Sequence, residues 1–112
     1  DLGVYRMLFD ISHGEEANSF CNQYLEKLME YDSKNNCEYM KTLRCIVKND
    51  WNLKKTADDL FIHYNTIKYR FSKISEIINL DLNNRENKFM IELCLKLMDI
   101  SKQYSLYMKT NI

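Results

Sequence analysis

Residues 56–74 read TADDLFIHYNTIKYRFSKI, and this stretch decides the fold. Around it, apolar residues recur at helical spacing on both sides of a short connection at 61–63: Leu53, Ala57 and Leu60 before it, and Ile67, Phe71, Ile74 and Ile78 after it. Two helices joined so closely cross at a steep angle, and only a small side chain such as that of Ala57 fits where their backbones approach. The stretch therefore predicts a helix-turn-helix over about 52–79, with helices over 53–61 and 64–79.

The second of these helices carries a polar face opposite its apolar stripe. Winding the helix at about 100° per residue directs seven side chains outward or to the flanks of that face: Asn65, Thr66, Lys68, Tyr69, Ser72, Lys73 and Glu76. An amide pairs with adenine, hydroxyl groups serve bases or phosphates, and Lys binds phosphate or guanine. Because these groups lie near the positive end of a helix dipole, they predict a recognition helix for the DNA major groove.

Two other residues of the motif have separate expected roles. His63 precedes the second helix, where it caps that helix, contacts phosphate, or is simply a partly exposed turn residue. Arg70 lies nearer the buried stripe than the outward face. We therefore expect Arg70 to have an intramolecular partner, either Asp58, Asp59 or a neighbouring carbonyl, rather than to read a base.

Charge is unevenly distributed along the chain. The sequence has 16 basic and 16 acidic residues, and a net charge of zero argues against a generic polyanion binder. Residues 40–75 nevertheless hold eight basic and three acidic residues, whereas residues 1–39 hold three basic and eight acidic residues. An electrostatic footprint for nucleic acid thus falls in the middle third, where Lys54 and Lys55 join the predicted DNA-contacting residues. A solvated charged face would give the same pattern.

Amphipathic stretches on both sides of the motif predict packing helices within 2–48 and over 85–107. The first of these regions divides into helices over about 2–11, 13–31 and 36–48. The expected core faces carry Val4, Tyr5, Leu8 and Phe9, then Phe20, Tyr24, Leu25 and Leu28, then Met40, Leu43 and Val47, and finally Phe89, Leu93, Leu97, Ile100 and Tyr104. Three pairs have the capping-box spacing that marks a helix start: Ser12 with Glu15, Asn35 with Glu38, and Asn83 with Glu86.

Composition excludes several classes of protein. Pro is absent and Gly occurs only at Gly3 and Gly14, so the residues that punctuate hairpins are missing and an all-α fold is expected. Charges interrupt every apolar stretch, which indicates a cytoplasmic protein that does not enter a membrane. The four cysteines are expected to be free and mostly buried. Without ligand-spaced Cys and His, a phosphate loop or a nucleophile motif, we expect no metal, no cofactor and no enzymatic activity.

The same stretch, with its surroundings, resembles a known family. Residues 56–74 are similar to the C-terminal helix-turn-helix domain of PucR and CdaR-type regulators, whose pattern runs T-A-x-x-L-F-[VI]-H-x-N-T-[LI]-x-Y-R-[LF]-x-x-I. Residues 1–8 resemble the family's D-L-G-x-Y-R-x-L, and residues 80–82 resemble its L-D-L. The likeness covers nearly the whole chain.

The resemblance adds to what the residues predict. A length of 112 residues suits one domain, expected over 1–112 as about six helices with a Fis-like helix-turn-helix. The family implies the C-terminal part of a longer bacterial transcription regulator, whose upstream domain senses a metabolite. Its recognition helix carries over onto Tyr64, Asn65, Thr66, Lys68, Tyr69, Arg70 and Lys73. Tyr64 stands where relatives often have Arg, and Ser72 where a basic residue is common, so positive charge is lower here.

One recognition helix reads only a few base pairs, so we expect a double-stranded DNA operator as the partner and a homodimer in the full-length protein. An alternative stays open: a helical protein–protein interaction or oligomerisation module that does not itself bind DNA. The acidic first third and the zero net charge favour this alternative. A salt-dependent interaction with duplex DNA distinguishes the two functions.

Overall fold

The computed structural model describes residues 2–12 and 14–111, and within these residues it contains six helices and no strand. The helices are α1 Leu2–Ser12, α2 Glu15–Asn35, α3 Tyr39–Lys48, α4 Leu53–Leu60, α5 Tyr64–Ile78 and α6 Arg85–Asn111. The predicted all-α fold is confirmed, and the predicted helix ends differ from the observed ends by a few residues. Some predictions lie outside the described residues: the helical start expected at 13, and the side chains of Tyr5, Phe9, Ser12 and Tyr104.

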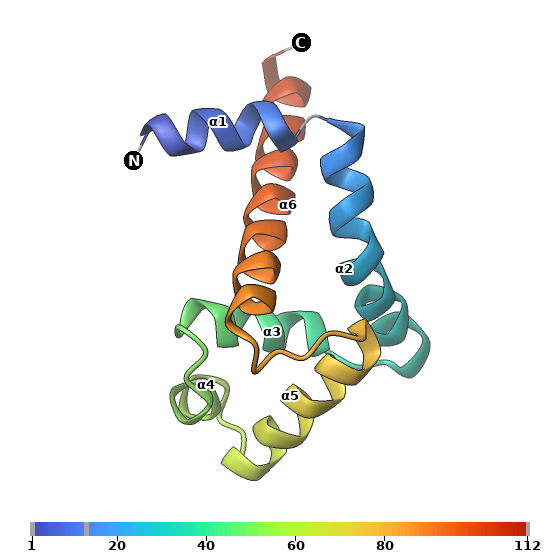
Figure 1. Ribbon diagram of the computed structural model, residues 1–112, viewed down its shortest axis with the longest axis vertical. Coiled ribbons are helices and arrows are strands. Elements are labelled where there is room, and N and C mark those ends of the chain that lie inside the picture. The colour runs from blue at the N-terminus through green and yellow to red at the C-terminus, as the bar shows by residue number, and fades with distance from the viewer. Residues whose placement is uncertain (1, 13, 112) are drawn as a thin grey trace.

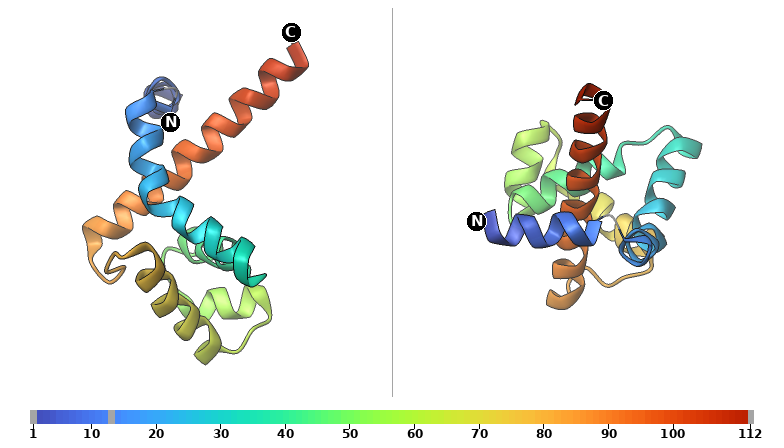
Figure 2. Two further views of the ribbon diagram at one scale, coloured as in Figure 1. Left: turned by 90° about the vertical axis from the view of Figure 1, so that its right-hand side faces the viewer. Right: turned by 90° about the horizontal axis from the view of Figure 1, so that it is seen from above.

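The helices gather at two ends of an elongated molecule (Figure 1). α3, α4 and α5 form one end, whereas α1 lies across α6 at the other end, beside the start of α2. α2 packs against α3, α5 and α6 and so joins the two ends. In Figure 2, the C-terminal part of α6 projects away from α3, α4 and α5. The helix-turn-helix, α4 and α5, therefore lies at the end of the molecule opposite α1.

One apolar core holds α2, α3, α5 and α6 together. Its buried members are Cys21, Leu25, Leu28, Leu43, Ile74, Ile78, Leu82, Ile91, Cys94, Leu95 and Leu97. Leu82 lies in the connection before α6, and its N–H donates to Ser75 Oγ at 3.1 Å. This bond fastens the connection to α5, so that α6 starts from a defined position.

Three residues predicted to face the core are instead exposed. The exposed fractions are 53% for Val4, 44% for Phe20 and 64% for Phe89. Each lies on an amphipathic helix, but helical spacing identifies the apolar side of a helix and not whether a neighbouring element covers it. The prediction failed for these residues because burial depends on packing between elements distant in sequence.

The three predicted capping boxes are wrong. α2 begins after Gly14, and Ser12 is the last residue of α1. Asn35 is the last residue of α2, which ends in a left-handed C-cap. At the start of α6, Asn84 rather than Asn83 is the cap, since its Oδ1 accepts from Asn87 N at 3.1 Å. Asn and Ser are common at both helix ends and in turns, so their spacing to Glu does not identify a start by itself.

α3 is capped by a residue of α2. Asp32 accepts two hydrogen bonds, one from Tyr39 N and one from Met40 N, each at 2.8 Å. Glu38, which precedes α3, makes no side-chain cap bond. The first N–H groups of a helix lack intrahelical acceptors, and a carboxylate there also meets the positive end of the dipole. Asp32 therefore holds the start of α3 against the end of α2.

The cysteines are free, as expected. Cys21 and Cys94 are buried, while Cys37 and Cys45 are half-buried. Burial, followed by the hydrogen bond to Cys21, raises the pKa of the Cys94 thiol far above its ordinary value, so this thiol stays protonated. Within the described ranges, no group of three or more acidic, His or Cys side chains is placed to bind a metal. No described helix combines the length and apolar character needed to cross a membrane.

Candidate nucleic-acid interface

A buried polar network fixes α4 to the end of α3. The Thr56 hydroxyl is fully buried; it donates to Asn52 O at 2.8 Å and accepts from Asn49 Nδ2 at 3.3 Å. Asn49 Nδ2 also donates to Asp59 Oδ2 at 2.9 Å. Asn52 caps α4, since its Oδ1 accepts from Lys55 N at 3.0 Å. Because buried polar groups are costly unless hydrogen-bonded, this satisfied network specifies one orientation of α4.

The turn between α4 and α5 is short and begins with a residue in the left-handed backbone conformation. Ala57 is buried, and its carbonyl accepts from Ile62 N at 3.0 Å. Phe61 ends α4 with a φ of 56°, and its side chain is 95% exposed. His63 then caps α5, because its Nδ1 accepts from Asn65 N at 3.1 Å. Among the roles expected for His63, the structure shows the cap of α5.

α5 has one buried and one exposed face. Ile67 and Ile74 are fully buried, while Phe71 and, in α4, Leu60 are half-buried. The exposed residues are Asn65, Thr66, Lys68, Tyr69, Ser72 and Glu76. The structure thus brings together most of the side chains that the sequence assigns to the outward face.

Lys73 lies at the flank of that exposed face. Its side chain is only 28% exposed, its Nζ lies 3.7 Å from Glu76 Oε1, and its Nζ lies 5.9 Å from the ring centroid of Tyr31. Tyr31 belongs to α2, which covers this side of α5. Winding α5 alone did not reveal this neighbour. The predicted flanking position of Lys73 therefore lies on the α2 side of α5, where Glu76 and the ring of Tyr31 lie close to its ammonium group.

Arg70 makes an intramolecular bond, but to a residue that the sequence did not indicate. Its Nη1 donates to Thr42 Oγ1 at 3.2 Å, and Thr42 is buried in α3. The predicted partners were Asp58, Asp59 or a neighbouring carbonyl. The carboxylate of Asp59 is instead bonded to Asn49. Arg70 therefore links α5 to α3.

Tyr64 joins the two helices of the motif. It is the first residue of α5 and is half-buried. Lys54 Nζ lies 5.8 Å from its ring centroid, and Lys68 Nζ lies 5.5 Å from the same point. Both distances fall within the range of cation–π attraction. The exposed Lys55 next to Lys54 makes no such contact in the described part of the chain.

An aromatic pair lies beside α5. Tyr31 of α2 and Tyr39 of α3 stack with ring centroids 5.6 Å apart and an interplanar angle of 8°. Burial, followed by the neighbouring Cys37 and Tyr31, raises the pKa of the Tyr39 hydroxyl above its ordinary value, and Arg70 opposes this effect. The cluster covers the side of α5 toward which Lys73 turns. Sequence reasoning missed this pair because its members lie on different helices.

A sequence model of a known family covers this arrangement. The model of the PucR C-terminal helix-turn-helix domain matches residues 39–97, from the first residue of α3 into α6. This chain belongs to that family. The matched residues of the PucR-type domain make up more than half of the chain and include α4, α5 and the polar network that orients them.

Individual relatives support the assignment of the chain to this family. The proline-responsive transcriptional activator PutR of Bacillus subtilis is 35% identical over 97 residues, which cover 87% of this chain and 24% of that protein. The DNA-binding transcriptional activator AdeR of Bacillus subtilis is 34% identical, with 87% and 23% covered. The carbohydrate diacid regulator of Escherichia coli is 33% identical over 92 residues, with 81% and 23% covered.

The chain spans about a quarter of the length of these curated relatives. They are regulators, and the PucR-type domain is a helix-turn-helix domain of such regulators rather than an enzyme. No solved structure matches the chain.

Trp51 connects the PucR-type motif to α6. Trp51 lies in the connection before α4 with a φ of 66°. Its Nε1 donates to Glu92 Oε1 at 2.6 Å, and Lys88 Nζ lies 5.5 Å from its ring centroid. The ring of Phe71 meets it edge-on at 6.2 Å between centroids. Trp51 is thus in contact with α5 and α6 at once.

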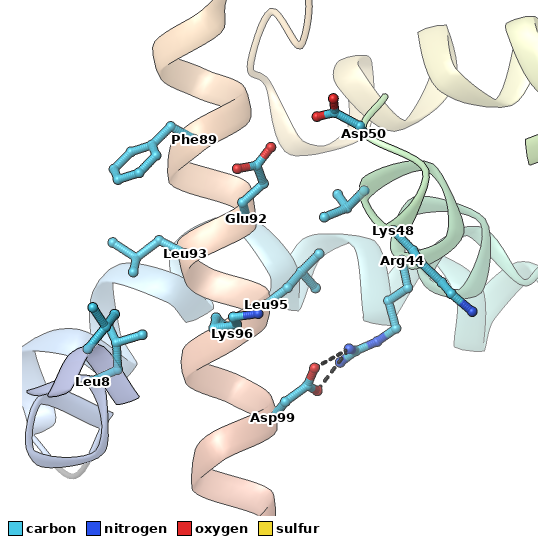
Figure 3. Close-up of a pocket in the computed structure, with 12 residues that line it drawn as sticks. Leu8, Arg44, Lys48, Asp50, Phe89, Glu92, Leu93, Leu95, Lys96 and Asp99 are labelled. Atoms are coloured by element: carbon cyan, nitrogen blue, oxygen red, sulfur yellow. Dashed lines mark hydrogen bonds and ion pairs between the residues drawn. The ribbon is translucent and has the colours of Figure 1, made fainter. Parts of the chain in front are cut away.

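A groove of about 820 Å³ lies away from the α4–α5 turn, between α1, α3 and α6 (Figure 3). Apolar side chains including Leu8, Leu93 and Leu95 line it. On its rim, Arg44 Nη1 bonds both carboxylate oxygens of Asp99, at 2.8 and 3.1 Å. The groove contains none of the residues predicted to contact DNA. It is therefore separate from the candidate interface.

Proposed function

We propose that this chain is the DNA-binding output domain of a bacterial, metabolite-responsive transcription regulator, and that α5 reads the major groove of an operator. The observation that carries the proposal is the exposed polar face of α5, which begins at the helix N-terminus and includes Asn65 and Tyr69. A recognition helix places its N-terminal residues against base edges, and an amide there pairs two-pronged with adenine. The names of PutR and AdeR as transcriptional activators support this function.

The proposed contacts divide into those that read bases and those that bind phosphates and so position the domain on DNA. Asn65 and Tyr69 read bases, with Thr66 and Ser72 beside them. Lys54, Lys55 and Lys68 neutralise phosphates, since all three are exposed and lie at or near the N-terminal halves of α4 and α5. His63 orients the start of α5 through its cap, and Tyr64 packs between the helices. Lys73, half-buried at the flank of α5 beside Glu76 and Tyr31, is a further proposed phosphate contact.

The wider organisation is part of the same proposal. The chain forms one domain over 1–112, follows a sensor domain in a longer regulator, acts in the cytoplasm and works as a homodimer on paired half-sites. Half-sites about 10–10.5 base pairs apart, centre to centre, would place both recognition helices on one face of DNA. Sedimentation of the full-length regulator on a duplex selected for binding should give two chains per duplex. A single chain per duplex at saturation would refute the paired arrangement.

The test of reading uses a duplex selected by the protein from a random pool, together with its scrambled counterpart. Asn65→Ala should weaken binding to the selected duplex by roughly 1–3 kcal/mol and leave the scrambled duplex almost unaffected, because a base contact is lost. Asn22→Ala, on the exposed surface of α2, is the matched control and should change neither affinity.

Two results would count against this function. An unchanged ratio of the two affinities in Asn65→Ala would show that this face of α5 does not read sequence. Absence of any salt-dependent binding to duplex DNA would favour the alternative function, a helical protein-interaction module.

A further inference from the structure

Tyr64 is the first residue of α5, and its ring meets a lysine from each of the two helices of the motif. Lys54 is the second residue of α4, and Lys68 is the fifth residue of α5. Their ammonium groups lie 5.8 and 5.5 Å from the centroid of the same ring. Both lysines are exposed, whereas Tyr64 is half-buried. The ring therefore holds two flexible cationic side chains at one point on the surface.

Neither ammonium group has an acidic partner among the described residues. The ion pairs found there join Lys41 with Glu38, Arg44 with Asp99, and Lys73 with Glu76. Asp58 lies one helical turn after Lys54 and forms no ion pair with it. Two like charges near one ring repel each other, and the repulsion is relieved when an anion binds between or beside them. A cation–π contact also leaves ammonium N–H groups available to donate.

The backbone geometry adds to this positive potential. Lys54 and Tyr64 lie in the first turns of α4 and α5, whose N-terminal ends carry partial positive charge. The contact with the ring of Tyr64 brings the ammonium group of Lys54, from the first turn of α4, close to the start of α5. A phosphodiester bears a single negative charge with oxygens that accept several hydrogen bonds, which suits two ammonium groups near a helix start.

We propose that Lys54 and Lys68 form one binding site for the backbone phosphates of duplex DNA, and that Tyr64 is its positioning residue. The inference rests on the proposed function and adds how the helix-turn-helix is positioned along the DNA backbone. The ring couples the site to both helices: α4 supplies one cation and α5 the other, so phosphate binding holds the crossing of α4 and α5 in place while α5 lies in the groove. The ring performs this role, and its hydroxyl group does not.

The test combines substitutions at the ring with substitutions at the lysines. Binding to the selected and scrambled duplexes is measured at several salt concentrations. Lys54→Ala and Lys68→Ala should each weaken binding to both duplexes alike, and each should reduce the slope of log affinity against log salt by about 0.9. Tyr64→Leu should weaken binding to both duplexes by about threefold to tenfold, because the two lysine side chains are no longer preorganised. Tyr64→Phe should restore the parent affinity.

Double substitutions show whether Tyr64 positions the lysines or only packs between the helices. The fold-loss caused by Lys54→Ala should shrink in the Tyr64→Leu background and stay unchanged in the Tyr64→Phe background. Lys55→Ala is the matched control, because Lys55 is exposed beside Lys54 without contacting the ring, and its fold-loss should be the same in all three backgrounds. A readout without DNA is the NMR shift of the lysine side-chain methylene protons. The ring should move these signals for Lys54 and Lys68 and not for Lys55.

The outcomes distinguish this site from the function on which it rests. Independent effects of Tyr64 and the two lysines, or equal losses for Tyr64→Leu and Tyr64→Phe, would overturn the site while salt-dependent DNA binding by the parent protein persists. If the parent protein binds neither duplex at low salt, the proposed function itself fails. Unaltered lysine proton shifts in Tyr64→Leu would overturn the positioning role even if that variant bound DNA poorly.

Discussion

Removal of the Asp32 carboxylate should loosen the start of α3. Asp32→Ala deletes both acceptors that receive Tyr39 N and Met40 N at 2.8 Å. The loss of a cap costs about 0.5–2 kcal/mol, and hydrogen bonds to a charged acceptor lie toward the upper end, while Ala regains a few tenths as the better helix former in α2. The free energy of unfolding should therefore fall by roughly 2 kcal/mol, which lowers the melting temperature by about 8 °C for a domain of this size.

Thermal and urea unfolding followed by circular dichroism measure this effect. Asp32→Asn keeps one acceptor oxygen and should lose about half as much stability as Asp32→Ala. Glu30→Ala is the matched control, because Glu30 is an exposed acid in the same part of α2. If Asp32→Ala and Glu30→Ala unfold at the same temperature and urea concentration, Asp32 does not hold α3, and the cap has no energetic role.

Three further changes test the motif and the start of α3. Ala57→Leu should overpack the crossing and lower the free energy of unfolding by roughly 1–3 kcal/mol; an unchanged melting temperature would show that the crossing has room. Phe61→Gly should raise that free energy by roughly 0.5–1 kcal/mol, because Phe61 has a φ of 56° and a 95% exposed ring, and a stability loss would contradict this. Tyr39 favours its neutral form in the fold, since its pKa is raised there, so stability should fall as pH rises above its ordinary value of 10.0. Tyr39→Phe should make that fall less steep in alkaline urea titrations, and an identical slope would refute the assignment.

The sequence predicted those elements that depend on residues close to one another along the chain. Apolar spacing identified all six helices because each amphipathic helix repeats with a period close to 3.6 residues. The short connection at 61–63 and the small side chain of Ala57 also predicted the crossing of α4 and α5, since both are local features of the sequence. Winding α5 by itself also separated Ile67 and Ile74 from the exposed Asn65 and Tyr69.

Contacts between distant elements could not be predicted in this way. Asp32 lies seven residues before the amide of Tyr39 that it caps, outside any local capping pattern. The contact of Lys73 with Tyr31 of α2 was not predicted, because nothing in the sequence relates Tyr31 to α5. Thr42 was missed as the partner of Arg70 for the same reason. Such pairs are specified by how helices pack, which one sequence without further information does not determine.

Trp51 gives this domain an intrinsic optical probe. It is the single tryptophan of the sequence, so all indole emission comes from one site. Its N–H is bonded to Glu92 of α6 at 2.6 Å and its ring meets Phe71 of α5 at 6.2 Å between centroids. A tilt of α6 relative to the motif would break the indole hydrogen bond and expose the ring to water, which shifts emission to the red. Signals that reach the motif through α6 would therefore be visible in unlabelled protein, in real time and in the presence of DNA.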